Sequence, residues 1–356
     1  FGSRRGTLGR LGAGRAMQRI GAAAAGFAGV AGSYFYLTSR RDISRLAAAR
    51  AASRDVGLTG RHALVVGGTS GIGHGLALRL AEAGCSVTVV GRSAERGSAV
   101  VSEMQAAAGP PAASGGGAAN CSAGPGPSFL FKPLDCFSLP ACGGFAEAYK
   151  ASGAPLDLLV LTQGMATIQG YTPTPAEKGG LDEKLTLHYY SRIALARALA
   201  PLLQKSSDGR CLSVLSAGVH APYENFAADP DLSRGSYTLK NVADSAGFYT
   251  DIALDRLSEE NPGVSFVHAA PGFIASSWGT EMPWAIRLVV RLLQNLGRSK
   301  EDCAEYLFRA LYHQDFAGGG FHLIDQYGEA TPSVTKLHAE AKDRVWSHTE
   351  SVLSQP

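Results

Sequence analysis

Residues 61–93 read RHALVVGGTSGIGHGLALRLAEAGCSVTVVGRS and carry the clearest structural signal in this 356-residue chain. Two short apolar runs, Leu64–Val66 and Ser86–Val90, flank the segment Gly73–Gly84. Apolar residues recur within that segment at the spacing of an amphipathic helix. The stretch therefore predicts a strand, a helix and a second strand.

A glycine-rich turn joins the first of these strands to the helix. Its glycines follow the spacing G-x-x-x-G-x-G within the sequence GGTSGIG. Glycine lets the backbone turn sharply and approach a pyrophosphate, while the amino end of the following helix offers unpaired N–H groups. We expect a nucleotide site here, although an ordinary strand-to-helix turn is the alternative. The expected binding residues are Gly67, Thr69, Ser70, Gly71, Ile72 and Gly73.

The end of the second strand indicates which nucleotide the site prefers. A carboxylate at this place would bind the ribose hydroxyls of NAD(H) and repel the 2′-phosphate of NADP(H). The chain has Gly91-Arg92-Ser93 instead, and a guanidinium can bind a phosphate with two hydrogen bonds. Arg92 and Ser93 therefore favour NADP(H), unless Arg92 is simply a solvated surface residue.

Strands and helices alternate along the rest of the chain. Further strands are expected at Phe129–Lys132, Leu156–Leu161, Leu212–Leu215 and Val264–Ala269, with helices around Leu185–Leu203 and Asn241–Leu257. This alternation predicts an α/β fold with a doubly wound, Rossmann-like parallel sheet, whose ligands bind at the carboxyl ends of the strands. We expect one such domain over residues 57–330, with a flexible Gly-, Ala- and Pro-rich insertion at 106–128 and a C-terminal helix at 331–356.

The composition excludes several classes of protein. Hydrophobic residues make up 45% of the chain and charged residues 18%, and the net charge is +3, so nothing suggests nucleic-acid binding. The six cysteines have neither metal-ligand spacing nor the pattern of a disulfide framework. We expect no metal site, and reduced thiols in a reducing compartment.

The N-terminal region has the composition of a targeting or membrane-proximal segment. No acidic residue precedes Asp42, whereas arginines are frequent there. The uncharged run Ile20–Leu37 is just long enough to cross a bilayer, for which ~17–25 residues are needed. We expect a basic leader at 1–19, an apolar anchor helix at 20–38 and a linker at 39–56, with a cleavable transit peptide as the alternative. We therefore expect the protein at an organellar membrane. The mitochondrial inner membrane is favoured over the plastid or the endoplasmic reticulum.

Five motifs together resemble the short-chain dehydrogenase/reductase family: GGTSGIG, VVGRS, LDCFSL, SVLSAG and AAPGFIASS, between Arg61 and Ser277. The resemblance implies that Asp135 contacts adenine and that Gly164 is what remains of the family's Asn-Asn-Ala-Gly. It also implies that the stretch from Pro271 to Ser276 packs against nicotinamide, through Pro271, Gly272, Ile274 and Ser276.

Catalysis is where this chain departs from the family pattern. In the family a Ser holds the substrate oxygen, a Tyr exchanges its proton, and a Lys four residues later lowers the pKa of that Tyr. Ser216 matches the Ser, but Lys240 follows Tyr237 by only three residues. Those two still share one helix face. Ungapped counting from Pro271, however, puts the family's Tyr and Lys at Asn241 and Ser245.

Two further features bear on chemistry. His188 stands where the family has an Asn that supports a proton-relay water; it could serve the relay or simply be packed in the core. Residues 283–312 correspond to the family's substrate lid, and the basic, apolar helix at its start would suit a lipophilic substrate or a membrane surface. Docking of that helix by its apolar face is equally compatible.

Two functions are therefore compatible with the sequence. The first is a membrane-associated, NADP(H)-dependent oxidoreductase that interconverts a carbonyl and an alcohol on a lipophilic small molecule. In it Ser216, Tyr237, Lys240 and His188 would carry catalysis. The second is an accessory subunit of an organellar membrane complex that binds the dinucleotide but has weak or no activity. A homodimer through the helices around His188 and Asn241 is compatible with either.

Overall fold

The computed structural model describes residues 42–108, 126–275, 284, 287, 297–332 and 334–354. The chain divides into two units, Phe1–Ala52 and Ser53–Pro356. The helix α2 (Asp42–Ser53) is the element described at the end of the first unit. The predicted leader and anchor at 1–38 lie outside the described residues, as does most of the predicted insertion at 106–128. None of the helices within the described ranges is long and apolar enough to span a bilayer.

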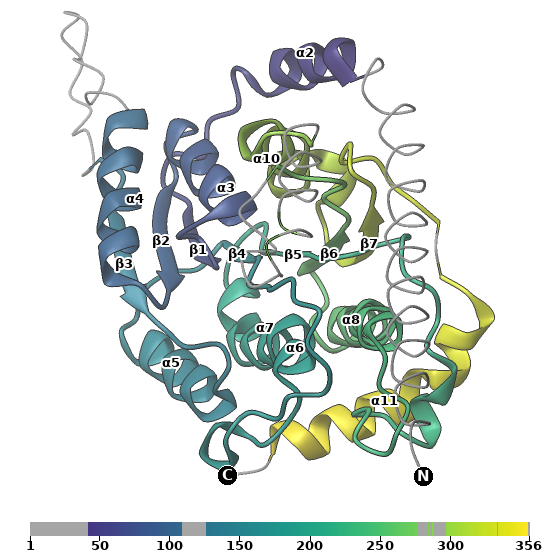
Figure 1. Cartoon of the computed structure of the whole chain (residues 1–356). Coiled ribbons are helices and arrows are strands. Elements are labelled where there is room, and N and C mark those ends of the chain that lie inside the picture. The colour runs from purple at the N-terminus through teal and green to yellow at the C-terminus, as the bar shows by residue number, and fades with distance from the viewer. Residues whose placement is uncertain are drawn as a thin grey trace, which may run out of the picture. The chain divides into compact units, whose positions relative to one another are not determined.

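The second unit is built on a seven-stranded parallel sheet (Figure 1). Its strands are β1 (His62–Val66), β2 (Ser86–Gly91), β3 (Phe129–Pro133), β4 (Leu158–Leu161), β5 (Arg210–Val214), β6 (Ser265–Ala269) and β7 (Gly320–Ile324). Their order is β3-β2-β1-β4-β5-β6-β7, which confirms the predicted doubly wound parallel sheet. The order reverses between β1 and β4, and that reversal opens a crevice at the carboxyl ends of the strands.

Helices cover both faces of the sheet (Figure 1). One layer contains α3 (Gly71–Glu82), α4 (Ala94–Ala107) and α10 (Lys300–Tyr312). The other contains α5 (Leu139–Ala151), α7 (Ser191–Leu203), α8 (Leu239–Glu260) and α11 (Lys336–Leu353). Each layer buries its own apolar cluster against the sheet. The central strands are consequently apolar on both faces, as in other parallel sheets covered by helices.

Short helical turns complete the unit and shape the connections. The helix α6 (Glu183–Leu185) continues through a π-helical turn, Thr186–Tyr190, directly into α7. Single 3₁₀ turns occur at Ala176–Lys178, Glu224–Ala227 and Gln314–Phe316. Such π turns inside helices are uncommon and occur frequently at functional sites.

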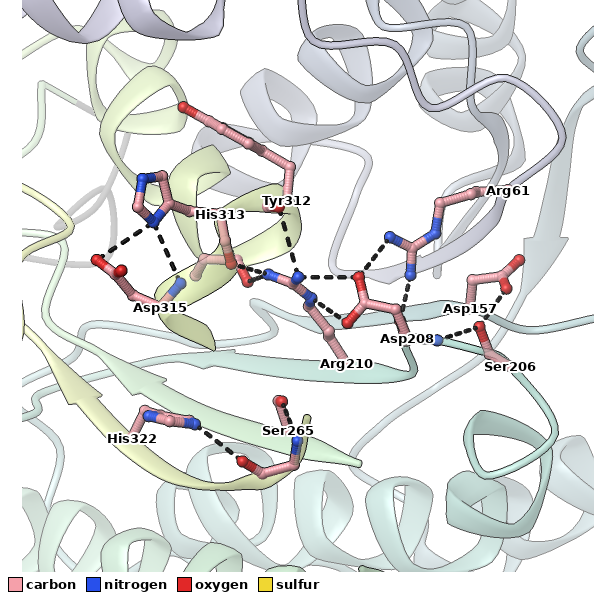
Figure 2. A network of polar contacts seen from close by, with 12 residues as sticks. Arg61, Asp157, Ser206, Asp208, Arg210, Ser265, Tyr312, His313, Asp315 and His322 are labelled. Atoms are coloured by element: carbon pink, nitrogen blue, oxygen red, sulfur yellow. Dashed lines mark hydrogen bonds and ion pairs between the residues drawn. The ribbon is translucent and has the colours of Figure 1, made fainter. Parts of the chain in front are cut away.

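A polar network fastens the amino ends of the strands, opposite the crevice (Figure 2). Arg210 is 1% exposed and forms two hydrogen bonds of 2.8 Å with the carboxylate of Asp208. Arg61 donates to the same carboxylate at 3.0 Å. Arg210 also donates to the carbonyls of Ala310 and His313, at the end of α10. These bonds satisfy carbonyls that a helix end leaves unpaired, and they join α10 to the start of β5.

Candidate functional site

The glycine turn lies at the switch point of the sheet and packs tightly against the end of β4. Gly67 has a φ of 81°, and a Cβ there would lie 2.7 Å from the backbone nitrogen of Gln163. A Cβ at Gly73 would overlap the hydroxyl of Thr162 and the carbonyl of Gly67. Both positions therefore require glycine because the turn, the first residues of α3 and β4 approach so closely.

Gly71 has a different role in the same turn. Its φ is 57°, and a Cβ there would meet no atom within 4 Å. The backbone is thus open at the amino end of α3. Ser70, the residue before this helix, makes no side-chain capping bond, so its hydroxyl does not occupy the N–H groups of the first turn. This arrangement leaves donors for an anion such as a pyrophosphate.

A cavity of about 1040 Å³ extends from this turn across the carboxyl ends of the strands. It is large enough for an extended cofactor, since ligand cavities typically measure about 300–1,000 Å³. The predicted residues that line it are Gly67, Thr69, Ser70, Gly71, Ile72, Arg92, Asp135, Gly164, His188 and Pro271. Gly73 lies inside the packed turn instead. Gly272 and Ile274 follow Pro271 without lining the cavity, and Ser276 lies outside the described residues.

Positive charge gathers at the end of β2. Arg92 is exposed, and its guanidinium carbon lies 5.1 Å from the centre of the Phe137 ring. Arg96, in the first turn of α4, also lines the cavity. Ser93 begins α4 as its N-cap, where its hydroxyl accepts a hydrogen bond of 3.3 Å from the Arg96 N–H. The two guanidinium groups and this helix end provide donors for a phosphate.

Asp135 lines the cavity after β3, in the place that the family resemblance implies. Lys178 donates to its carboxylate at 2.8 Å and the Phe137 N–H donates at 3.2 Å. Burial acts to raise the pKa of Asp135, but the hydrogen bonds from Lys178 and the Phe137 N–H, together with the charges of Lys178 and Arg92, outweigh it, so the pKa lies below its usual value. Asp135 is therefore ionised and already paired with a cation.

His188 also lines the cavity, and it lies on the π-helical turn. Its Nε2 accepts a hydrogen bond of 2.9 Å from the backbone N–H of Met165. Burial, together with the charge of Arg192, lowers the pKa of His188 to about 3. The imidazole is therefore neutral at physiological pH. In this state it holds the loop after β4 and does not supply a proton.

Arg192, one turn after His188, was not anticipated from the sequence. It is 1% exposed and donates to the carbonyls of Leu161 and Val214 at 3.2 and 2.8 Å. Burial lowers the pKa of Arg192 to about 9. Its guanidinium joins the ends of β4 and β5, and Arg192 also lines the cavity. The available signal was an arginine at the second residue of α7, a mostly apolar helix that also contains Arg197.

Ser216 follows β5 and has a histidine at each side. Its N–H donates to His268 Nε2 at 3.0 Å, and its Oγ lies 3.3 Å from His220 Nδ1. Both histidines, together with His338, contact the carboxylate of Asp251 on α8. We call these four residues the Asp251 cluster. Sequence reasoning missed it, because its members come from four separate elements.

The structure does not bring Tyr237 and Lys240 together. Lys240 is 73% exposed at the side chain and pairs with Asp244, one turn later on α8. The hydroxyl of Tyr237 accepts a hydrogen bond of 2.9 Å from Lys184 instead. Tyr237 precedes Thr238, the N-cap of α8, and so lies outside the helix. The expected alignment of Tyr237 and Lys240 on one helix face is therefore not formed.

The positions reached by ungapped counting do not restore the dyad. Asn241 lies in the first turn of α8 and donates its side-chain amide to the Ser236 carbonyl at 2.7 Å. Ser245, one turn later, is fully buried and bonded to the carbonyl of Val242 at 3.2 Å. Neither side chain can replace a phenol–ammonium pair, because an amide and a hydroxyl do not titrate near neutrality.

A parallel sheet of this strand order, with a glycine turn at its switch point, defines a Rossmann-type dinucleotide-binding protein. A family model described as short chain dehydrogenase matches residues 61–228. The chain belongs to the short-chain dehydrogenase/reductase family of oxidoreductases. The cofactor of this fold is a nicotinamide dinucleotide, and the open turn at Gly71 fits its pyrophosphate.

Individual relatives agree with this assignment over most of the chain. An oxidoreductase of Emericella nidulans is 28% identical, over 82% of this chain and 92% of its own length. A polyprenol dehydrogenase of Mus musculus is 29% identical, over 81% of this chain and 82% of its own. A short-chain dehydrogenase structure from Shigella flexneri, complexed with NADP, superposes with a TM-score of 0.53. That structure is 17% identical and covers 76% of this chain and 98% of its own, so it supports the fold alone.

Proposed function

We propose that this protein is an NADP(H)-dependent oxidoreductase that interconverts a carbonyl and an alcohol on a lipophilic small molecule. The observation that carries the cofactor preference is the exposed Arg92 at the end of β2, with Arg96 beside it on the cavity wall. Two guanidinium groups at this place favour a cofactor with a 2′-phosphate. The nearby carboxylate of Asp135 does not oppose them, because Lys178 neutralises it.

The substrate class rests on the cavity wall and on one relative. Ile72, Leu134, Met165 and Leu215 contribute apolar side chains to the cavity. The mouse relative is named as acting on a polyprenol, a long isoprenoid alcohol. An isoprenoid alcohol or aldehyde is therefore the substrate class that we propose. Association with an organellar membrane through residues 20–38 belongs to the same proposal and rests on the sequence alone.

Cofactor binding by the full chain tests the first half of this proposal. NADPH is expected to bind at least about tenfold more tightly than NADH, which corresponds to about 1.4 kcal/mol. Arg92→Ala should remove most of that preference, whereas Arg256→Ala, on the exposed side of α8, should not. Equal affinity for both cofactors in the unaltered chain would contradict the assignment.

Turnover measurements test the second half of the proposal, which is the reaction and its substrate class. The full chain should oxidise NADPH in the presence of farnesal, a short isoprenoid aldehyde, and should reduce NADP with farnesol. One observation favours the alternative of an accessory subunit with little activity: Tyr237 and Lys240 are not assembled. Tight NADPH binding without turnover, together with migration in a larger membrane assembly, would support that alternative.

A further inference from the structure

The Asp251 cluster surrounds one buried carboxylate with three imidazoles. Asp251 is 1% exposed. Its Oδ1 lies 2.5 Å from His268 Nδ1, and its Oδ2 lies 3.1 Å from His220 Nε2 and 3.3 Å from His338 Nε2. An ionised carboxylate can only accept hydrogen bonds. Each of these three ring nitrogens therefore carries a proton.

The opposite ring nitrogens show which histidine is charged. His268 Nε2 accepts the N–H of Ser216, and His338 Nδ1 accepts the N–H of Thr335 at 2.9 Å. Because an acceptor nitrogen carries no proton, His268 and His338 are both neutral. Their protons are committed to Asp251, so these two rings hold the carboxylate in place.

His220 differs because both of its ring nitrogens face oxygen acceptors. Its Nδ1 lies 2.8 Å from the carbonyl oxygen of Ser216, which can only accept. Its Nε2 faces Asp251. Both nitrogens therefore donate, and His220 is an imidazolium paired with a buried carboxylate. The same Nδ1 nitrogen lies 3.3 Å from the Oγ of Ser216.

The fold makes room for this ring. Gly247 on α8 faces Ser216 and His220, and a Cβ there would overlap both the His220 ring and the Ser216 hydroxyl. The side chain of His220 is only 4% exposed. A glycine in the middle of a helix costs about 0.5–1 kcal/mol relative to alanine. That cost is consistent with a requirement for His220 beside Ser216.

A metal ion is the competing explanation of the cluster. His220, Asp251 and His338 place one potential ligand atom each within 4.8 Å of one another. A ligating imidazole must offer an unprotonated nitrogen. His338 offers none toward Asp251, because its Nδ1 already accepts the Thr335 N–H and its Nε2 must then be protonated. The hydrogen bonds therefore account for the cluster without a metal.

We propose that His220, held by Asp251, acts through Ser216 to supply the proton that a tyrosine supplies elsewhere in the family. This proposal rests on the proposed function. Its basis is geometric: His220 is the charged donor in contact with the Ser216 hydroxyl, while Tyr237 is bonded to Lys184 and Asn241 to Ser236. The relay therefore runs from Asp251 through His220 to Ser216.

The proton balance of the relay is simple. A reduced nicotinamide dinucleotide supplies the hydride that forms the new C–H bond. As the C=O π bond breaks, the substrate oxygen takes the hydroxyl proton of Ser216, and Ser216 takes the Nδ1 proton of His220. Neutral His220 then recovers a proton from water. In the oxidising direction the relay starts from neutral His220: the alcohol passes its proton to Ser216 Oγ as Ser216 passes its own proton to His220 Nδ1.

The groups around His220 set the pH at which the relay is charged. Asp251 and Asp244 face it from α8, His268 from β6 and His338 from α11. Burial acts to lower the pKa of His220, but the hydrogen bond and charge of Asp251, together with the Ser216 carbonyl and the charge of Asp244, outweigh it and raise the pKa above its ordinary value. The imidazolium therefore persists at neutral pH and is discharged as the pH rises.

The test compares His220→Gln with the matched variant His322→Gln in the full chain, with NADPH and farnesal as reactants. His322 lies on β7, is not among the residues that line the cavity, and forms a hydrogen bond with the Gly319 carbonyl. His220→Gln should lower kcat about 100-fold or more, since general acid catalysis contributes about 10²–10⁴-fold. The KM for NADPH should not change. The alkaline limb of the kcat profile, which reports discharge of His220, should also disappear, and imidazole should partly rescue His220→Ala.

A second readout needs no cofactor. Nitrogen NMR of histidine-labelled full chain should show one buried ring, absent from His220→Gln, with both nitrogens protonated at pH 7. A neutral His220 at this pH would overturn the relay, as would His220→Gln with unaltered kcat and pH profile. If Tyr237→Phe loses turnover and His220→Gln does not, Tyr237 is the proton donor and the relay is wrong. Lack of turnover by the unaltered chain would instead contradict the proposed function itself, and with it the relay.

Discussion

Lys184 donates a hydrogen bond of 2.9 Å to the hydroxyl of Tyr237, across 53 residues of sequence. Lys184 is only 5% exposed, and it also donates to the carbonyl of Gln169 at 2.8 Å. The tyrosine thus has a lysine partner, but one from α6 and not from its own helix. Burial and the charge of Asp182 raise the pKa of Tyr237, so Lys184 does not turn it into an acid active near neutrality.

Lys184 is therefore expected to matter for stability. Lys184→Met should lower the free energy of unfolding by about 1–3 kcal/mol, because buried acceptors lose their donor. Lys240→Met should change it by less than about 0.5 kcal/mol, since Lys240 is an exposed surface residue. Urea denaturation of both variants measures the difference. Equal effects would mean that Tyr237 depends on Lys240 as much as on Lys184.

The glycine turn gives a prediction with an internal control. Gly73→Ala should destabilise the protein by about 1–3 kcal/mol, because its Cβ would overlap Thr162 and Gly67. It should also weaken NADPH binding. Gly143→Ala lies in α5 with no atom within 4 Å of the new Cβ, and should stabilise by about 0.5–1 kcal/mol. Thermal melts and cofactor titrations of the two variants would reveal any deviation.

The polar network at the amino ends of the strands predicts that the loss of one carboxylate lowers the stability strongly. Asp208→Ala should cost about 3–5 kcal/mol, because it leaves the buried guanidinium of Arg210 without its anion. Glu350→Ala provides the comparison, since its pair with Arg197 is exposed and should contribute less than about 1 kcal/mol. Denaturant melts of both variants measure these costs. A small loss for Asp208→Ala would show that water compensates for the missing carboxylate.

His188 should make stability depend on pH. Its pKa is about 3 in the folded protein, through burial and the charge of Arg192, against about 6.5 in an unfolded chain. Between these values the unfolded state binds the extra proton, so the free energy of unfolding falls as the pH decreases. His188→Asn should flatten this dependence relative to the unaltered protein between pH 6.5 and 4. Parallel curves for the two proteins would show that His188 is not the group responsible.

Local patterns were sufficient to predict most of the sheet. Six of the strands and the helix at α8 follow from apolar runs and helical spacing, which depend on neighbours along the chain. The strand β7 was not predicted, since GFHLI is short, is interrupted by a histidine and is preceded by two glycines. The cofactor end of the cavity was predictable for the same reason, because its turn is one continuous motif.

The surroundings of Tyr237 and Ser216 were not predictable, because their contacts are not local. Lys184 and Tyr237 lie 53 residues apart, and His338 reaches Asp251 across 87. The spacing of Tyr237 and Lys240 suggested a dyad that requires both residues to lie in one helix, and α8 begins between them. Only the tertiary arrangement shows which histidine faces Ser216.

The network of Arg210 and Asp208 stabilises one edge of the sheet, and the cavity lies at the other edge. It secures β5 and α10 at the amino ends of the strands, while the cavity opens at the carboxyl ends. Substitutions in the cavity wall can therefore accumulate without breaking the hydrogen bonds of this network. For directed evolution, residues such as Met165 and Leu215 are the positions to randomise when a new substrate is sought, and Asp208 is one to leave untouched.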